Sequence, residues 1–246
     1  MGGGKNEHRW RVAGAALALA ASFCVTPAVA QHLRPPTAAE SSMLKHYSDT
    51  VHKVLDQFGS DNWEESVDYD VTDDVTVHDA LNIPLDIDEM MERSYTIRNG
   101  SKLYEQEIEP FAKKLENIHD PAEMAKLAAQ LKLNRMTVEV HFNRVDVGID
   151  PPPPGNQDLH IPGAALAYRV SNYKFDKGTS VILLFGDWKS AAWKAADGAY
   201  KYKFKHAPHQ PAIENIEIHF DGSPERIDEL LRTVKWEKIN DALSNP

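Results

Sequence analysis

The segment from residue 136 to residue 143 alternates apolar and polar side chains one by one. The apolar members are Met136, Val138, Val140 and Phe142, and the polar members are Thr137, Glu139, His141 and Asn143. Successive side chains of a strand point to opposite faces, so this pattern predicts a strand in a sheet with one covered side. We expect further strands at 165–171, 180–185, 199–205 and 213–220. Their connections are mostly too short for helical crossovers, which favours antiparallel pairing.

Helical spacing precedes the sheet and follows it. Apolar residues recur every three or four positions from Met43 to Phe58, and Gly59 then ends the pattern. We expect further helices at 86–98, 101–115, 120–132 and 223–234; several begin at a capping residue or a proline. Residues 60–85 are acidic and loop-like, with an alternation at 67–77 that allows a short strand.

These elements predict an α+β fold, with N-terminal helices packed on a mainly antiparallel sheet of about five strands and a closing C-terminal helix. We divide the chain into a leader (1–30), a flexible linker (31–42), a helical region (43–133), and the sheet with its last helix (134–246). The last two regions are expected to form one compact unit.

The leader has the pattern of a secretory signal peptide. Basic residues precede an apolar run at 12–25, and Ala28-Val29-Ala30 precedes Gln31. The run is shorter than the roughly 20 residues that a membrane-spanning helix needs, so a retained anchor is the less favoured alternative. Lipidation at Cys24 is another, disfavoured by the bulky Phe23. The leader resembles those of Gram-negative bacteria and predicts a periplasmic protein, or alternatively a secreted one.

Cleavage after Ala30 would leave an acidic chain without cysteine. The whole chain has a formal charge of −10, and loss of the leader, with three basic residues and one acidic, makes it −12. This charge disfavours nucleic acid and anionic membranes as partners. With Cys24 gone, disulfides and thiolate chemistry are excluded. No transmembrane segment is expected in the mature chain, and no cofactor motif occurs.

Histidines and aspartates supply two metal-site hypotheses. His206, His209 and His219 would meet if their segments formed a hairpin, and imidazole suits zinc, copper or nickel. The alternative is that they are surface histidines, because their spacing matches no established metal pattern. Asp68, Asp70 and Asp79 occupy three places of a calcium loop, but Asp73 stands where glycine is required, which favours a solvated acidic loop. A divalent metal therefore stays a possible cofactor that no motif requires.

Lysines and tryptophans supply candidate ligand-binding residues. Lys201, Lys203 and Lys205 alternate with aromatic residues, which predicts an anion-binding stripe or, alternatively, lysines that protect an exposed strand from aggregation. Asp187 and Trp188 follow an apolar strand, and Trp193 comes soon after. An aspartate beside two indoles suits a sugar, although a tryptophan that closes the end of a sheet would give the same pattern.

Two functions are consistent with these residues. The first is a non-enzymatic protein that binds a small ligand or an envelope component through the outer face of the sheet and the loop at 186–198. The second is a hydrolase, possibly metal-dependent, that uses Asp187 and the sheet histidines. The two hypotheses differ in geometry, because the hydrolase requires Asp187 and a histidine to converge in one pocket.

Overall fold

The computed structural model has an α+β fold and confirms the predicted class. The chain divides into two units, residues 1–30 and 31–246, and the structure describes residues only in the second. The described residues are 33–59, 61–70, 76–78, 83–85, 87, 91–132, 135–147, 151–152, 159–170, 179–188, 192–194 and 198–244. The predicted leader therefore lies outside the described residues.

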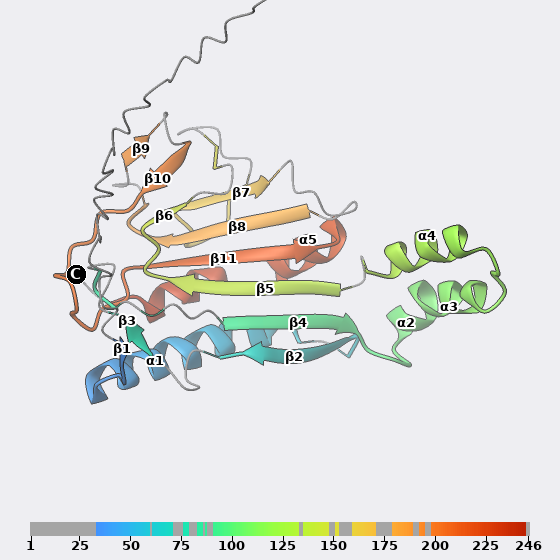
Figure 1. Cartoon of the computed structure of the whole chain (residues 1–246), viewed down its shortest axis with the longest axis horizontal. Coiled ribbons are helices and arrows are strands. Elements are labelled where there is room, and N and C mark those ends of the chain that lie inside the picture. Colours follow the sequence, from blue (N-terminus) through green and yellow to red (C-terminus); the bar gives the residue numbers. More distant parts are fainter. Residues whose placement is uncertain are drawn as a thin grey trace, which may run out of the picture. The chain divides into compact units, whose positions relative to one another are not determined.

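A six-stranded sheet is the centre of the fold (Figure 1). Its order is β2-β4-β5-β11-β8-β7, and every neighbouring pair is antiparallel. The strands are β2 (Trp63–Tyr69), β4 (Met91–Ile97), β5 (Arg135–Phe142), β7 (Leu166–Val170), β8 (Thr179–Gly186) and β11 (Asn215–Gly222). The sheet is antiparallel as predicted and has one strand more than expected. It gains β2 and β4 from the region predicted to be helical, and it does not include the strand predicted at 199–205.

The segment 91–97 is a strand, so the helix predicted at 86–98 is wrong there. Met91, Arg93, Tyr95 and Ile97 are buried on one face of β4, which is a period of two. Ile87, Met91 and Tyr95 also recur at the four-residue spacing of a helical face when they are read without partners. Pairing with β2 on one side and β5 on the other stabilises the extended form.

One face of the sheet is covered by α1 (Ala38–Leu55), which continues into a short turn of helix, η1 (Asp56–Phe58). The buried apolar side of α1 consists of Leu44, Tyr47, Val51, Val54 and Leu55. We expected the helix to begin at Met43. It begins five residues earlier, at Ala38, because Thr37 and Glu40 form a capping box. The C-terminal elements are α5 (Pro224–Thr233) and η3 (Trp236–Ala242), and η3 packs back on α1.

Three helices are inserted between β4 and β5 and extend beyond the ends of these strands (Figure 1). They are α2 (Lys102–Glu107), α3 (Glu109–Leu115) and α4 (Pro121–Lys132). Ser101 caps α2 by accepting the backbone N–H of Tyr104, and Asp120 accepts that of Ala122 before α4. The predicted helix starts at 101 and 120 are thus confirmed, although the stretch 101–115 is two helices.

Smaller sheets complete the structure. β6 (Asp146–Val147), β10 (Ala199–Lys201) and β9 (Ala192–Lys194) form a three-stranded sheet, and β1 (Leu33–Arg34) pairs with β3 (Val77–His78). A second apolar cluster joins β10 and the segment after it to β7 and β8, on the face opposite α1. The strand predicted at 199–205 ends at Lys201. Within the described part of the chain, no helix has the length and apolarity to cross a membrane.

Candidate functional site

Trp188 belongs to the second apolar cluster. Its side chain is only 3% exposed, and its ring meets the Tyr202 ring edge-on, with 4.8 Å between the centres. The indole N–H donates to the backbone oxygen of Phe185 at 3.1 Å. Trp188 therefore packs in the interior at the end of β8, as in the alternative interpretation. Trp193 lies in β9, and its side chain is outside the described part of the structure.

Two of the three predicted anion-binding lysines form ion pairs. Lys201 Nζ lies 2.7 Å from Asp146 Oδ2, and Lys205 Nζ lies 3.2 Å from Asp187 Oδ2. Lys203 is exposed. The aromatic residues between them point into the second cluster, as the alternation predicts. Because carboxylates already offset two of the ammonium charges, this stripe is a weak candidate for an anion site.

The three histidines of the metal hypothesis occupy different parts of the fold. His206 Nδ1 lies 3.0 Å from Glu214 Oε1, and His209 is in a turn with φ of 63°. His219 is buried in β11, five residues beyond Glu214, which is roughly 17 Å along a strand. Among the described residues, no group of three or more His, Cys, Asp or Glu side chains could hold a metal ion.

The calcium hypothesis falls partly outside the described residues, since Asp73 and Asp79 are among those not described. Asp70 is described, and it faces α1. Its Oδ2 lies 2.7 Å from His52 Nε2, and the Ser48 hydroxyl donates to its two oxygens at 3.1 and 3.2 Å. The structure thus assigns Asp70 to a hydrogen-bonded group with two residues of the helix.

This group forms one wall of a pocket beside α1, with a volume of about 440 Å³. Ser48 and His52 are four residues apart, so they share a face of the helix, and Asp70 follows β2. Leu44 and Pro36 supply apolar lining. At the rim, Lys45 Nζ pairs with both oxygens of Asp49 at 2.8 Å. We call this cavity the α1 pocket.

Arg93 fixes the wall of the α1 pocket from behind. Its side chain is 2% exposed, and its guanidinium contacts His52 Nδ1. It also lies 2.5 Å from Glu65 Oε1 and 3.0 Å from Asp56 Oδ1. Burial raises the pKa of Glu65, with a smaller contribution from the nearby Asp56 charge, and burial also raises the pKa of Asp56. A cation this deeply buried has to be paired, and here two carboxylates pair it.

These contacts determine which nitrogen of His52 carries the proton. A guanidinium only donates hydrogen bonds, so Nδ1 must accept from Arg93. The proton of the neutral ring is then on Nε2, which donates to Asp70. Asp70 therefore accepts from both Ser48 and His52. The wall is a chain of donors and acceptors in which the Ser48 hydroxyl and the His52 ring both donate to Asp70.

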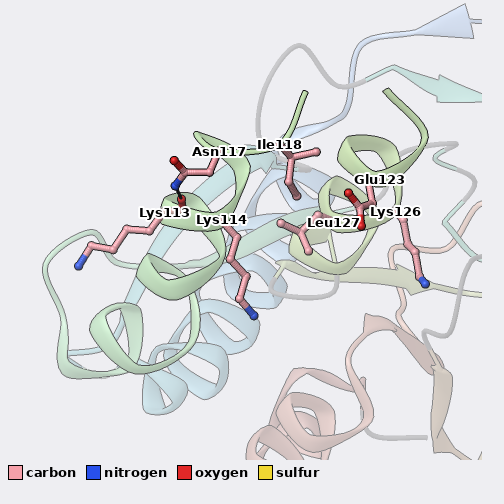
Figure 2. Close-up of a pocket in the computed structure, with 7 residues that line it drawn as sticks. All are labelled: Lys113, Lys114, Asn117, Ile118, Glu123, Lys126 and Leu127. Carbon is pink, nitrogen blue, oxygen red and sulfur yellow. Dashed lines mark hydrogen bonds between the residues drawn. The ribbon is translucent and has the colours of Figure 1, made fainter. Parts of the chain in front are cut away.

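A second pocket, with a volume of about 590 Å³, lies between α3 and α4. Figure 2 shows Ile118 and Leu127 between the two helices and the side chain of Lys113 pointing away from them. Lys113 pairs with Glu109 at 2.7 Å, and Lys114 Nζ lies 5.6 Å from the centre of the Phe111 ring. This pocket has no comparable group of side chains hydrogen-bonded to one another within the described residues, so the α1 pocket is the stronger candidate.

Sequence reasoning missed the α1 pocket. The one local signal was the spacing of Ser48 and His52 on the polar edge of an amphipathic helix. Asp70 and Arg93 come from segments 18 or more residues away, and only the packing of α1 against β2 and β4 brings them there.

In comparisons with known proteins, no family model, no curated protein and no solved structure matches the chain. A proposal about function therefore depends on the geometry of the site.

Proposed function

We propose that this chain is a non-enzymatic binding protein that holds a small hydroxyl-bearing molecule in the α1 pocket. The observation that carries the proposal is the hydrogen-bonded group of Ser48, His52 and Asp70 in the wall of a cavity. A concave site with a few converging polar groups is the usual form of a small-molecule site. Buried Arg93 holds the group in place, so the wall is ordered before a ligand arrives.

The lining favours a neutral polar ligand over a charged one. The carboxylate of Asp70 lines the cavity, and a hydroxyl group can donate to it as the Ser48 hydroxyl does. The one lysine of the lining pairs with Asp49. Leu44 and Pro36 suit the C–H face of a carbon ring. These features match a polyol or a monosaccharide better than a phosphate or a carboxylate.

Export and partners also belong to this proposal. Residues 1–30 support a periplasmic location, with secretion as the alternative, and the ligand would then be a small molecule of that space or part of an envelope component. The hydrolase hypothesis gains no support from geometry. Asp187 pairs with Lys205, and His206 pairs with Glu214, whose carboxylate also accepts the backbone N–H of Lys205, so each proposed catalytic side chain is engaged in an ion pair.

The test compares the binding of neutral polyols by the unchanged chain and by the Asp70→Asn variant. Glucose, myo-inositol and glycerol would be titrated against the purified chain by saturation-transfer NMR. Loss of a hydrogen bond to a charged group costs about 1.5–3 kcal/mol, so we expect affinity to fall about tenfold or more. The matched control is Asp61→Asn, which makes the same charge change at an exposed position outside the α1 pocket.

Equal affinity of both variants would refute the proposal, and so would the absence of binding by all three polyols at millimolar concentration. Thermal unfolding of Asp70→Asn shows whether the variant is folded, so that a folding defect is not mistaken for a binding defect.

A further inference from the structure

The face of the sheet opposite α1 carries a group of ionisable side chains on two central strands. β5 and β11 bury Val138, Val140 and Ile218 against α1, so the residues between them face the other way. In the register of this pair, His219 lies opposite Glu139, and Glu217 lies opposite His141. We call the set of Glu139, His141, Glu217, His219 and Asp221 the outer-face cluster.

Two histidines of the outer-face cluster share one carboxylate. Glu139 Oε2 lies 3.6 Å from His141 Nε2 and 3.8 Å from His219 Nδ1. His219 Nε2 lies 3.5 Å from Asp221 Oδ2. Burial alone would lower the pKa of His219, but the Glu139, Asp221 and Glu217 carboxylates outweigh burial and raise it. The imidazoles hold the pKa of Glu139 far below its ordinary value. Glu139 is therefore held in its ionised form.

Glu217 is the carboxylate of the cluster that has a buried oxygen without a hydrogen-bond donor. Its side chain is 5% exposed, and its Oε2 has no hydrogen-bond partner among the described residues. Arg144 Nε lies 3.5 Å from this oxygen and donates no hydrogen bond to it. A buried carboxylate oxygen without a donor costs free energy, so an N–H group placed there would stabilise the structure. Asp221, by contrast, accepts the Ser180 hydroxyl.

We propose that the outer-face cluster binds a small organic cation, an alkylammonium or a guanidinium, whose N–H group donates to Glu217 Oε2. Glu139 is the neighbouring carboxylate on β5, diagonal to Glu217 in the register, and at 32% exposure of its side chain it receives a second N–H group. A metal ion is the less suitable occupant, because among the described side chains none form a group that could coordinate one. The site is independent of the α1 pocket, which lies on the other face of the sheet.

Arg144 is a competitor for the same oxygen. Its side chain is 44% exposed, so it can move toward solvent when a ligand cation approaches Glu217. The proposal therefore predicts opposite effects for two variants. Glu217→Gln removes the acceptor charge and weakens binding, whereas Arg144→Gln removes the competing cation and strengthens it. Gln has nearly the shape of Glu, so the first variant is expected to keep the fold.

The experiment is a titration of the full chain with n-butylammonium chloride at constant ionic strength, followed by the NMR signals of the His141 and His219 rings. We expect saturable shifts, at least tenfold weaker binding for Glu217→Gln and severalfold tighter binding for Arg144→Gln. Glu237→Gln is the charge-matched control, at an exposed position on η3, and we expect it to bind like the unchanged chain.

Neutral n-butanol separates recognition of charge from apolar contact, and we expect it to shift neither ring. Equal shifts with n-butanol and n-butylammonium would overturn the proposal. Equal weakening by Glu217→Gln and Glu237→Gln would also overturn it, because the attraction would then come from the overall negative charge of the chain and not from Glu217. Failure of either kind leaves the polyol test of the α1 pocket unaffected.

Discussion

At the scale of single residues, Arg93 departs furthest from what its type predicts. An arginine side chain is rarely buried, and it is then paired with other groups. Arg93 is buried in the main core, on the face of β4 that meets α1. It joins three segments, since its partners come from α1, η1 and β2. Its role is to hold His52 and the carboxylates in one arrangement, which also orders the α1 pocket.

We expect Arg93→Ala to lower the free energy of unfolding by about 3–5 kcal/mol, because removing one partner of a buried charge network leaves the others uncompensated. Urea denaturation measures this change. Arg232→Ala, at an exposed position on α5, is the control and is expected to change stability by less than about 0.5 kcal/mol. Similar losses for the two variants would show that Arg93 is not a structural anchor.

At the scale of elements, the start of α1 depends on one carboxylate. Glu40 closes the capping box with Thr37 and pairs with Arg34, at 2.7 and 2.8 Å. The hydrogen bond from Arg34 is the largest influence, and it holds the pKa of Glu40 at about 2, below the ordinary value of 4.5. This ion pair also ties β1 to the first turn of the helix.

The lowered pKa of Glu40 predicts a pH dependence with a definite sign. The folded state prefers the ionised form, so the stabilisation is complete above pH 4.5 and is lost as the pH falls toward 2. The difference in melting temperature between the unchanged chain and Glu40→Gln should therefore be largest at neutral pH and shrink across this window. A difference that is the same at pH 3 and pH 7 would contradict the assignment.

At the scale of the whole molecule, β8 is buried on both faces. Val181, Leu183 and Phe185 belong to the main core with α1, whereas Ile182 and Leu184 belong to the second cluster under the smaller sheet. A strand covered on both sides has no polar alternation. This explains the continuous apolar run at 181–185.

We expect Leu183→Ala and Leu184→Ala to lower the free energy of unfolding by similar amounts, about 2–5 kcal/mol each, because both side chains are fully buried. Val145→Ala is the control, since Val145 is one of the exposed large apolar residues. Chemical denaturation compares the three variants. A Leu184→Ala variant as stable as the control would show that the second cluster adds nothing to the global fold.

The sequence by itself determined the class of fold and several element ends. Alternation at 136–142 requires a strand because side chains of an extended chain point to opposite faces in turn. The helix starts at 101 and 120 could also be predicted, because a capping hydrogen bond joins residues only two or three positions apart. These signals are local, so they can be interpreted without knowing which distant residues pack against them.

Tertiary structure decided the remainder. Residues 91–97 fit a helix until β2 and β5 pair with them, and the burial of Trp188 depends on Tyr202 from another element. The α1 pocket depends on the same kind of contact, since Asp70 reaches Ser48 and His52 only after α1 packs on the sheet. Such contacts join residues distant in sequence, and neither periodicity nor capping encodes which distant residue will become the neighbour.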